Sequence, residues 1–353
     1  MRRKTSRSRL AAAIVERIRR QQRAAGRARV AAMSQVTLTQ AIVLRVTDYG
    51  EADRIVTLLT ERHGKVSALA RGAKKSRKRF GAALGLFGCG EASLRERSDL
   101  WILEELHAQR GFLRLGQELG RFGHACYVCE LCQHLCPPHE PEPQVYALLN
   151  AFLQHLDDLP LADRPTVGPL RSFELRLLDA VGLGLSLRAC AACGTDLVRA
   201  LDSTARSSAR LRSASEAQAL PLPLGGDPGS SALGMTAVPV PAPVPVPVPV
   251  YVPFDVERGG VHCPHTCFGG PTPQDLGLIL SGRSGGLPVA VWRALIELAE
   301  SDPCALPEPR LAVLPPAVQT TCRDVLLAVL RHHLGRDLRA VEFIGKLNRS
   351  LLQ

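Results

Sequence analysis

The sequence predicts an α+β protein in which a small N-terminal β-barrel is followed by a mostly α-helical domain with a four-cysteine zinc element. Short β-branched runs alternate with turn residues between residues 39 and 106. Beyond Gly111 the apolar residues recur at helical spacing. Two close cysteine pairs flank a long low-complexity stretch. With 353 residues, 46% of them apolar, the chain can bury a core in about two domains.

A basic leader occupies residues 1–34. Residues 1–35 hold eleven Arg or Lys against one acid, Glu16, so 33 basic residues face 32 acidic ones in the remainder. The net charge of +11 therefore says little about the folded body. The leader is open to three interpretations: a nucleic-acid-binding arm, a transit-peptide-like segment, or untranslated sequence before a start at Met33. We favour the last and expect the leader to be disordered or not translated.

Residues 35–111 form the predicted barrel domain. Strands are expected at 39–47, 53–61 and 64–72, separated by the turn residues DYGEA and RHG. Two more are expected near 91–97 and 100–106. Five short strands in about seventy residues are typical of an oligonucleotide-binding (OB) barrel.

Residues 112–353 form the predicted helical domain. A Ser-, Ala-, Gly- and Pro-rich insertion at 203–253 interrupts it and ends in PVPAPVPVPVPVYVP. Alternating proline fits neither a helix nor a ladder, so we expect a disordered, extended spacer. Helices are expected near 113–136, 142–158, 167–181, 288–299, 316–334 and 338–352.

Removing the insertion brings two cysteine pairs together, one at 190–194 and one at 259–267. Cys190, Cys193, Cys263 and Cys267 then form a C-x2-C…C-x3-C set, which suits a tetrahedral Zn²⁺ with bonds of about 2.3 Å. Four protein ligands leave no open position, so such a zinc would be structural. Unliganded thiols, or a ligand set that includes His262 or His265, remain alternatives because 69 residues separate the pairs.

A second cysteine run, CYVCELCQHLCP at 126–137, matches the spacing of a bacterial iron–sulfur ligand run. Its 3-3-4 spacing is also helical spacing and would place all four thiols on one buried stripe. No residue between 126 and 135 breaks a helix, and the chain has no second matching run. We therefore favour a core helix, and an iron–sulfur or redox protein built on Cys126, Cys129, Cys132 and Cys136 is the alternative function.

The loop at 71–79, RGAKKSRKR, carries six cations and no acid between two predicted strands. At the rim of an OB barrel these side chains would neutralise DNA phosphates. Tyr49, Phe80, Phe87 and Trp101 are the only candidates for base stacking, which favours sequence-tolerant binding. The predicted nucleic-acid-binding residues are Arg71, Lys74, Lys75, Arg77, Lys78 and Arg79 in the loop, extended by Arg45 and Lys65 on the strands.

Other functional classes have little support in the sequence. It contains no Walker A, HExxH or dinucleotide-binding motif, and no catalytic residue is proposed. A G-x-S-x-G match at Gly282, Ser284 and Gly286 lies in a predicted loop between helices with no strand before it. The sequence has no uninterrupted stretch of roughly 18 apolar residues, as a membrane span requires, and no export signal. In a cytosolic protein, which we therefore expect, eleven cysteines indicate metal ligands or reduced thiols rather than disulfides.

The order of these parts resembles the RecO family of bacterial DNA repair and recombination mediators. The resemblance rests on QAIVLRVTDYGEADRIVTLLTERHGKVSALARGAKKSRKRFG, SFELRLLDAVGLGLSLRACAACG, FDVERGGVHCPHTC and LGRDLRAVEFI. It covers residues 37 to 350 apart from the insertion. The insertion and the leader depart from the family pattern.

The resemblance implies a non-enzymatic protein of the bacterial cytoplasm and nucleoid. It would bind single- and double-stranded DNA, anneal complementary strands, contact RecR and the single-stranded-DNA-binding protein, and help to load RecA. It also implies that the loop at 71–79 meets DNA and that the four cysteines of the split set hold structural zinc. A pure scaffold without DNA affinity is a third possibility.

Overall fold

The computed structural model describes residues 36–76, 78–97, 100–160, 167–203, 251–264, 267, 275–302, 304 and 314–350. The predicted leader and nearly all of the predicted insertion lie outside the described residues. The chain divides into two compact units. The first comprises residues 1–184, 301–313 and 334–353, and the second comprises residues 185–300 and 314–333.

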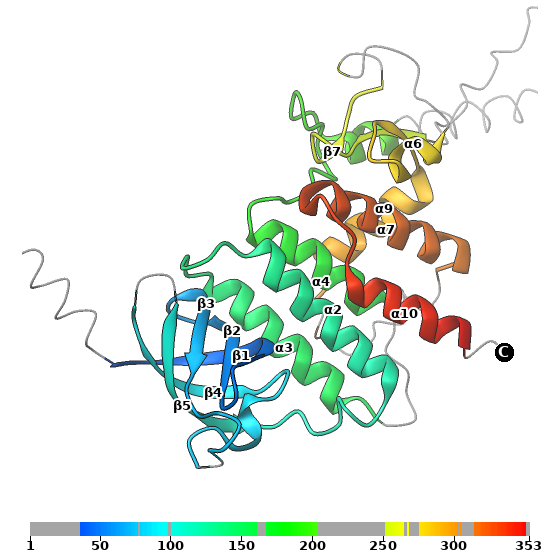
Figure 1. Ribbon diagram of the computed structural model, residues 1–353. Helices are drawn as coiled ribbons and strands as arrows, with labels where there is room; N and C mark the ends of the chain where they lie inside the picture. Colours follow the sequence, from blue (N-terminus) through cyan, green and yellow to red (C-terminus); the bar gives the residue numbers. More distant parts are fainter. Residues whose placement is uncertain are drawn as a thin grey trace, which may run out of the picture. The chain divides into compact units, whose positions relative to one another are not determined.

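The first unit begins with the predicted five-stranded closed barrel (Figure 1), in the order β1-β2-β3-β5-β4. All strand pairs are antiparallel except the short parallel contact of β3 with β5. A short 3-10 helix, η1 (Gly81–Leu84), lies between β3 and β4. The strands are β1 (Val36–Tyr49), β2 (Asp53–Thr60), β3 (Gly64–Ala70), β4 (Cys89–Arg95) and β5 (Trp101–Arg110).

Strand β1 is buried on both of its faces over residues 41–44. Val43 belongs to the apolar core inside the barrel, together with Leu58 and Leu94. Helix α2 (Leu119–Leu135) packs against the other face of β1. A bulge between Val43 and Arg45 then shifts the register with β2, and the strand emerges into solvent from Arg45 onward. Helix therefore covers the barrel over the middle of β1, and the C-terminal end of the strand is open.

Helix α2 is the central helix of the first unit and contacts α3 (Pro143–Asp158), α4 (Val167–Ala180) and α10 (Arg339–Ser350). It begins later than the predicted residue 113. The carboxylate of Glu118 accepts the backbone amides of Gly120 and Arg121, which fixes the N-terminus there. Leu113 is left 79% exposed.

Buried polar side chains tie these helices together. Arg121 is fully buried and donates to the carbonyls of Leu156, Leu159 and Pro160, at the C-terminal end of α3. A guanidinium suits this position because the unpaired carbonyls of a helix end carry partial negative charge. Glu174, also fully buried, accepts from Tyr127 at 2.6 Å and faces Arg171 at 3.0 Å.

The second unit contains a three-stranded antiparallel sheet that the sequence did not predict, in the order β7-β6-β8. Strand β6 starts at Tyr251, so the prediction that the insertion runs to residue 253 is wrong at its end. Pro253 has no backbone N–H to donate to a neighbouring strand. It is tolerated because the β6–β7 ladder pairs only Phe254 and Asp255 of β6, so no pair with β7 is lost at Pro253. The elements of the unit are β6 (Tyr251–Asp255), β7 (Gly260–Val261), α6 (Leu276–Leu280), β8 (Gly285–Pro288), α7 (Val289–Glu300) and α9 (Pro316–Leu334).

The glycine-rich segment at 282–286 is only partly a loop, because β8 begins at Gly285. Helix α6, not a strand, precedes it. A nucleophile elbow requires a strand before the turn, so the G-x-S-x-G match is not an elbow. Within the described part of the chain, every helix is too short or too polar to cross a lipid bilayer.

Candidate nucleic-acid interface and metal centre

The basic loop is fastened to the turn between β1 and β2. Lys74 donates through its backbone amide to the carbonyl of Ala52 at 2.9 Å and through Nζ to the carbonyl of Gly50 at 3.0 Å. The amide of Gly72 donates to Asp53 Oδ1 at 2.7 Å. The turn and the loop, 20 residues apart in sequence, therefore form one continuous surface at the open end of the barrel.

Two of the predicted loop cations are occupied within the protein. Lys74 Nζ also lies 3.3 Å from Asp48 Oδ2, and its side chain is only 26% exposed. Arg79 donates to the carbonyl of Arg71 at 2.7 Å and lies 5.0 Å from the centre of the Phe80 ring. These two side chains shape the loop before any ligand arrives.

Three other loop cations point to a different use. Arg71, Lys75 and Lys78 are exposed and make no ion pair with any described residue. Arg77, the sixth predicted cation, lies outside the described residues. The structure thus divides the predicted set into cations that build the loop and exposed cations that have no ion pair among the described residues.

The two predicted strand cations lie in different surroundings. Arg45 is exposed on β1, at the point where the strand leaves the helices. Lys65 instead donates to the carbonyl of Gln133 at 2.6 Å, near the end of α2. Half-buried there, Lys65 has a lowered pKa because burial disfavours its charge. The structure does not bring Lys65 to the basic loop.

Only one of the four candidate stacking aromatics is accessible. Phe80, Phe87 and Trp101 are 2%, 6% and 5% exposed, and Phe80 and Trp101 belong to the barrel core. Tyr49, the last residue of β1, is 55% exposed. The acid beside it is neutralised, because Arg54 and then Lys74 bond to Asp48 and lower its pKa.

The split cysteine set converges in the second unit. The sulfur atoms of Cys190, Cys193, Cys263 and Cys267 all lie within 4.8 Å of one another. Cys193 Sγ and Cys263 Sγ are 3.6 Å apart, and four sulfurs at about 2.3 Å from one tetrahedral ion are about 3.8 Å apart. The residues therefore fit a four-coordinate metal ion.

Hydrogen bonds prepare these thiols to ionise. Burial raises the pKa of Cys190, but backbone amides of Cys193 and Cys263 point at its sulfur and bring the pKa below its ordinary value. The hydroxyl and amide of Thr195 lower the pKa of Cys193 to about 6. Thiolates are the form that binds metal, so both residues suit that role.

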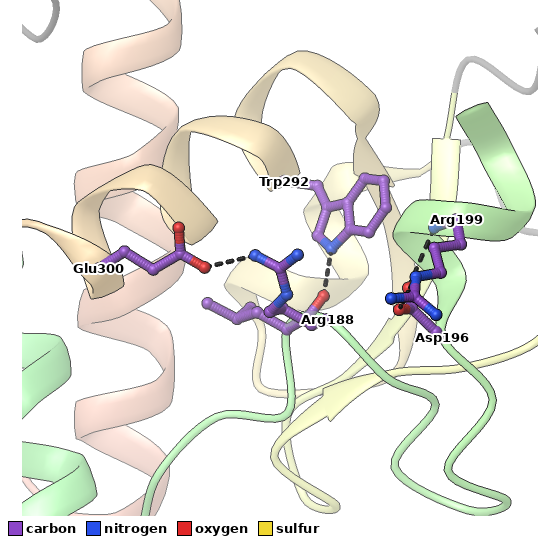
Figure 2. Close-up of polar contacts among 6 residues, drawn as sticks. Arg188, Asp196, Arg199, Trp292 and Glu300 are labelled. Carbon is purple, nitrogen blue, oxygen red and sulfur yellow. Dashed lines mark hydrogen bonds and ion pairs between the residues drawn. The ribbon is translucent and has the colours of Figure 1, made fainter.

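Helix α7 contacts the residues just before the first cysteine pair (Figure 2). Trp292 of α7, 1% exposed, donates to the carbonyl of Leu187 at 2.7 Å, and Arg188 pairs with Glu300 at the end of the same helix. The amide of Ala191 donates to the carbonyl of Val261 in β7 at 2.8 Å. The second pair follows β7 directly, so this bond joins the two halves of the centre.

His262 is not part of the cysteine cluster. Its Nδ1 lies 4.0 Å from Cys190 Sγ, and its ring is almost fully buried. His265, the other alternative ligand, lies outside the described residues. Among the described residues, the four cysteines alone form a group with metal-site spacing.

The run at 126–136 is helical, as the sequence favoured. Cys126, Cys129 and Cys132 lie on α2, and Cys136 caps its end. Burial raises the pKa of Cys126 to about 11 and that of Cys129 further. Thiols along one helix cannot surround a cluster, so the iron–sulfur alternative is not supported. The predicted stripe of thiols is only partly buried, because Cys126 is half-buried.

A groove of about 370 Å³ in the first unit was not predicted from the sequence. Helix α2, strand β1 and the start of α10 enclose it, with Phe122 and Phe343 on its apolar side. Arg45, Arg336 and Arg339 also line it. Two acids line it as well, Glu130 and Asp337, so the three arginines outnumber them, and the carboxylate of Glu130 accepts the amides of the first turn of α10 at 3.0 and 2.8 Å.

Comparisons with known proteins agree with this architecture. Two family models match the chain, Recombination protein O N terminal over residues 33–112 and Recombination protein O C terminal over residues 116–224. A DNA repair protein RecO of Anaeromyxobacter sp. (strain K) is 36% identical over 326 residues, which are 90% of this chain and 99% of the relative.

Two further relatives carry the same name. That of Myxococcus xanthus is 30% identical over 310 residues, 87% of this chain and 96% of the relative. That of Geobacter sulfurreducens is 42% identical over 157 residues, 44% of this chain and 63% of the relative. Barrel, helical domain and full-length similarity together establish that the chain belongs to the RecO family of DNA repair and recombination proteins, which are mediators rather than enzymes.

Proposed function

We propose that this protein binds single- and double-stranded DNA through the open end of its barrel and anneals complementary strands. The observation that carries the proposal is the division of the basic loop: Lys74 and Arg79 hold its shape while Arg71, Lys75 and Lys78 stay unpaired among the described residues. Cations held in place but not neutralised bind phosphates and release counterions. Two strands that repel one another can then meet on one cationic surface without a covalent step.

The loop proposal is tested by one triple variant and two matched single variants. Replacing Arg71, Lys75 and Lys78 with alanine should weaken binding to every sequence by roughly one to two orders of magnitude, and lower the salt slope for single strands by about 2. Comparing Lys75→Ala with Lys74→Ala separates the two roles. The first removes only a phosphate contact, and the second disturbs the shape of the loop. Lys74→Ala should also lower protection of the Gly72 and Lys74 amides from hydrogen exchange. Unchanged affinity and slope in the triple variant would exclude the loop.

We propose that the four-cysteine centre holds Zn²⁺ as a structural ion. Sulfur-only ligands at this spacing and the amides directed at Cys190 support zinc. When bound, the ion would fasten residues 190–194 to residues 263–267 on either side of the long insertion. Metal analysis of the purified protein should give about one zinc per chain and no iron.

We further propose that the protein acts with RecR and the single-stranded-DNA-binding protein to assist loading of RecA, in the bacterial cytoplasm at the nucleoid. The groove beside α10 supports a protein contact, since an apolar floor with an arginine rim complements an acidic segment that carries apolar side chains. We assign this groove to the single-stranded-DNA-binding protein.

Annealing of complementary oligonucleotides coated with single-stranded-DNA-binding protein tests this assignment. The double variant Arg336→Glu, Arg339→Glu should lose annealing on coated strands while keeping annealing on bare strands. The loop variant should lose both. Equal annealing of coated strands by the parent and the groove variant would remove the groove from the proposal.

A further inference from the structure

We propose that Tyr49 stacks on a nucleobase and thereby gives the barrel a preference for single-stranded over double-stranded DNA. This inference rests on the proposed DNA-binding function and specifies which form of DNA the surface selects. It starts from one contrast: the other candidate aromatics of the barrel are buried, while Tyr49 is 55% exposed.

The register of β1 places the Tyr49 ring on the outward face of the strand. Val46 packs against the barrel core, so the alternating residues Arg45, Thr47 and Tyr49 point outward. All three are exposed. They span about 13 Å at the rise of a β-strand, a track that runs from the arginine at the groove to the aromatic ring beside the basic loop.

The same register brings the ring to the loop. Tyr49 pairs with Asp53 across the β1–β2 ladder, and residues directly opposite each other share a face. Asp53 Oδ1 accepts the amide of Gly72, at the start of the loop that carries Lys75 and Lys78. The aromatic ring therefore lies at the start of a loop that carries unpaired cations, and an aromatic ring with nearby cations is the combination that holds a base and its phosphate.

The turn carries three acids: Asp48 and Asp53 are engaged within the protein, while Glu51 is exposed. Asp48 is paired with Arg54 at 3.1 Å and with Lys74 at 3.3 Å, and Asp53 is occupied by the backbone of the loop. With Asp48 and Asp53 engaged, a phosphate backbone that follows the loop cations can pass on that side of the turn and bring a base to Tyr49. In a duplex the bases are stacked on one another, so their faces are closed to the ring.

Three variants test the stacking role. Tyr49→Leu removes the ring but keeps apolar area, Tyr49→Trp retains an aromatic face, and Leu38→Ala is a matched control at another exposed apolar residue of β1, 52% exposed. Anisotropy with labelled oligothymidylate and with a duplex of equal length gives the affinities. Thermal unfolding checks that each variant keeps the parent fold.

Tyr49→Leu should bind oligothymidylate about tenfold more weakly, with duplex affinity within about twofold of the parent and the salt slope unchanged. Leu38→Ala should match the parent. Tyr49→Trp should keep its affinity, and its emission should be quenched by oligothymidylate but not by duplex. Trp101 and Trp292 are 5% and 1% exposed, so the parent provides the unquenched reference.

Oligothymidylate binding by Tyr49→Leu at the parent affinity would overturn the stacking role, as would Tyr49→Trp emission that single strands leave unchanged. Equal losses for single strands and duplex would also overturn it, because the residue would then act without distinguishing the two forms. Failure of the proposed function would give a different result. In that case the variant with Arg71, Lys75 and Lys78 replaced by alanine would bind DNA as tightly as the parent.

Discussion

The two cysteine groups of this protein differ in the opposite way from what their spacing in the sequence suggests. The run at 126–136 places four thiols within eleven residues, yet α2 spaces them along its length, with Cys129, Cys132 and Cys136 buried and Cys126 half-buried. The split set spans 78 residues from Cys190 to Cys267, yet its sulfurs lie within 4.8 Å of one another. A helix fixes the distance between successive thiols, whereas two loops joined by a short sheet can bring distant ones together.

The largest difference between the groups should appear in metal content. Cys190→Ser should reduce bound zinc from about one equivalent to near zero, because three thiolates and an alcohol bind far more weakly than four thiolates. Cys129→Ser should leave zinc unchanged. Metal analysis after gel filtration provides the measurement, and zinc loss in the Cys129 variant instead would contradict the comparison.

Thiol chemistry should separate the groups almost as widely. After zinc is removed by a chelator, Cys193 should react first with iodoacetamide at pH 7, because it is exposed and its pKa is about 6. Cys129, buried and with a raised pKa, should stay unmodified until the protein unfolds. Peptide mass spectrometry over time gives the order. Early labelling of Cys129 would show that the reagent reaches this thiol in the folded protein, which would contradict its burial in the core.

The helix that carries the run should respond to acid rather than to chelator. Burial, followed by the charge of Arg171, lowers the pKa of His124 on α2 to about 4. The unfolded chain protonates first, below about pH 6.5, so the contribution is complete above that pH and is lost as pH falls toward 4. The free energy of unfolding should drop by about 2 kcal/mol from pH 8 to pH 5 on this account.

His124→Leu isolates this contribution, since the other histidines remain in the variant. Urea unfolding at both pH values should show a smaller drop for the variant, by about the same 2 kcal/mol. Parallel losses in parent and variant would mean that His124 is protonated without cost in the folded protein.

The smallest effect should come from shortening a thiol in the run. Cys132→Ala removes one buried sulfur from the packed centre of α2 and should cost about 1 kcal/mol of stability, with zinc content unaltered. His262→Ala, beside the other group, should likewise retain zinc because His262 is not among the clustered ligands. Zinc loss in His262→Ala would restore the mixed ligand set as an explanation.

The sequence alone determined the barrel, the principal helices of the predicted helical domain at 112–353 and the four-cysteine set. Each depends on local periodicity, on turn residues or on paired ligands, which adjacent residues specify. The start of β6 at Tyr251 and the start of α2 at Leu119 were missed. A sheet partner, Pro288 opposite Tyr251, and a cap, Glu118, decide these ends, and no run of apolar residues indicates either.

Only the tertiary structure decided which cations of the basic loop are available. In the sequence Lys74 and Lys75 are neighbours of equal charge, but Lys74 is bound by Asp48 and Gly50, residues brought close by strand pairing. Tyr49 is left exposed where β1 ends, while Trp101 is buried, with His63 and His139 beside its ring. Charge and residue type belong to the sequence, while the partner that neutralises a charge or covers a ring is a distant residue placed by the fold.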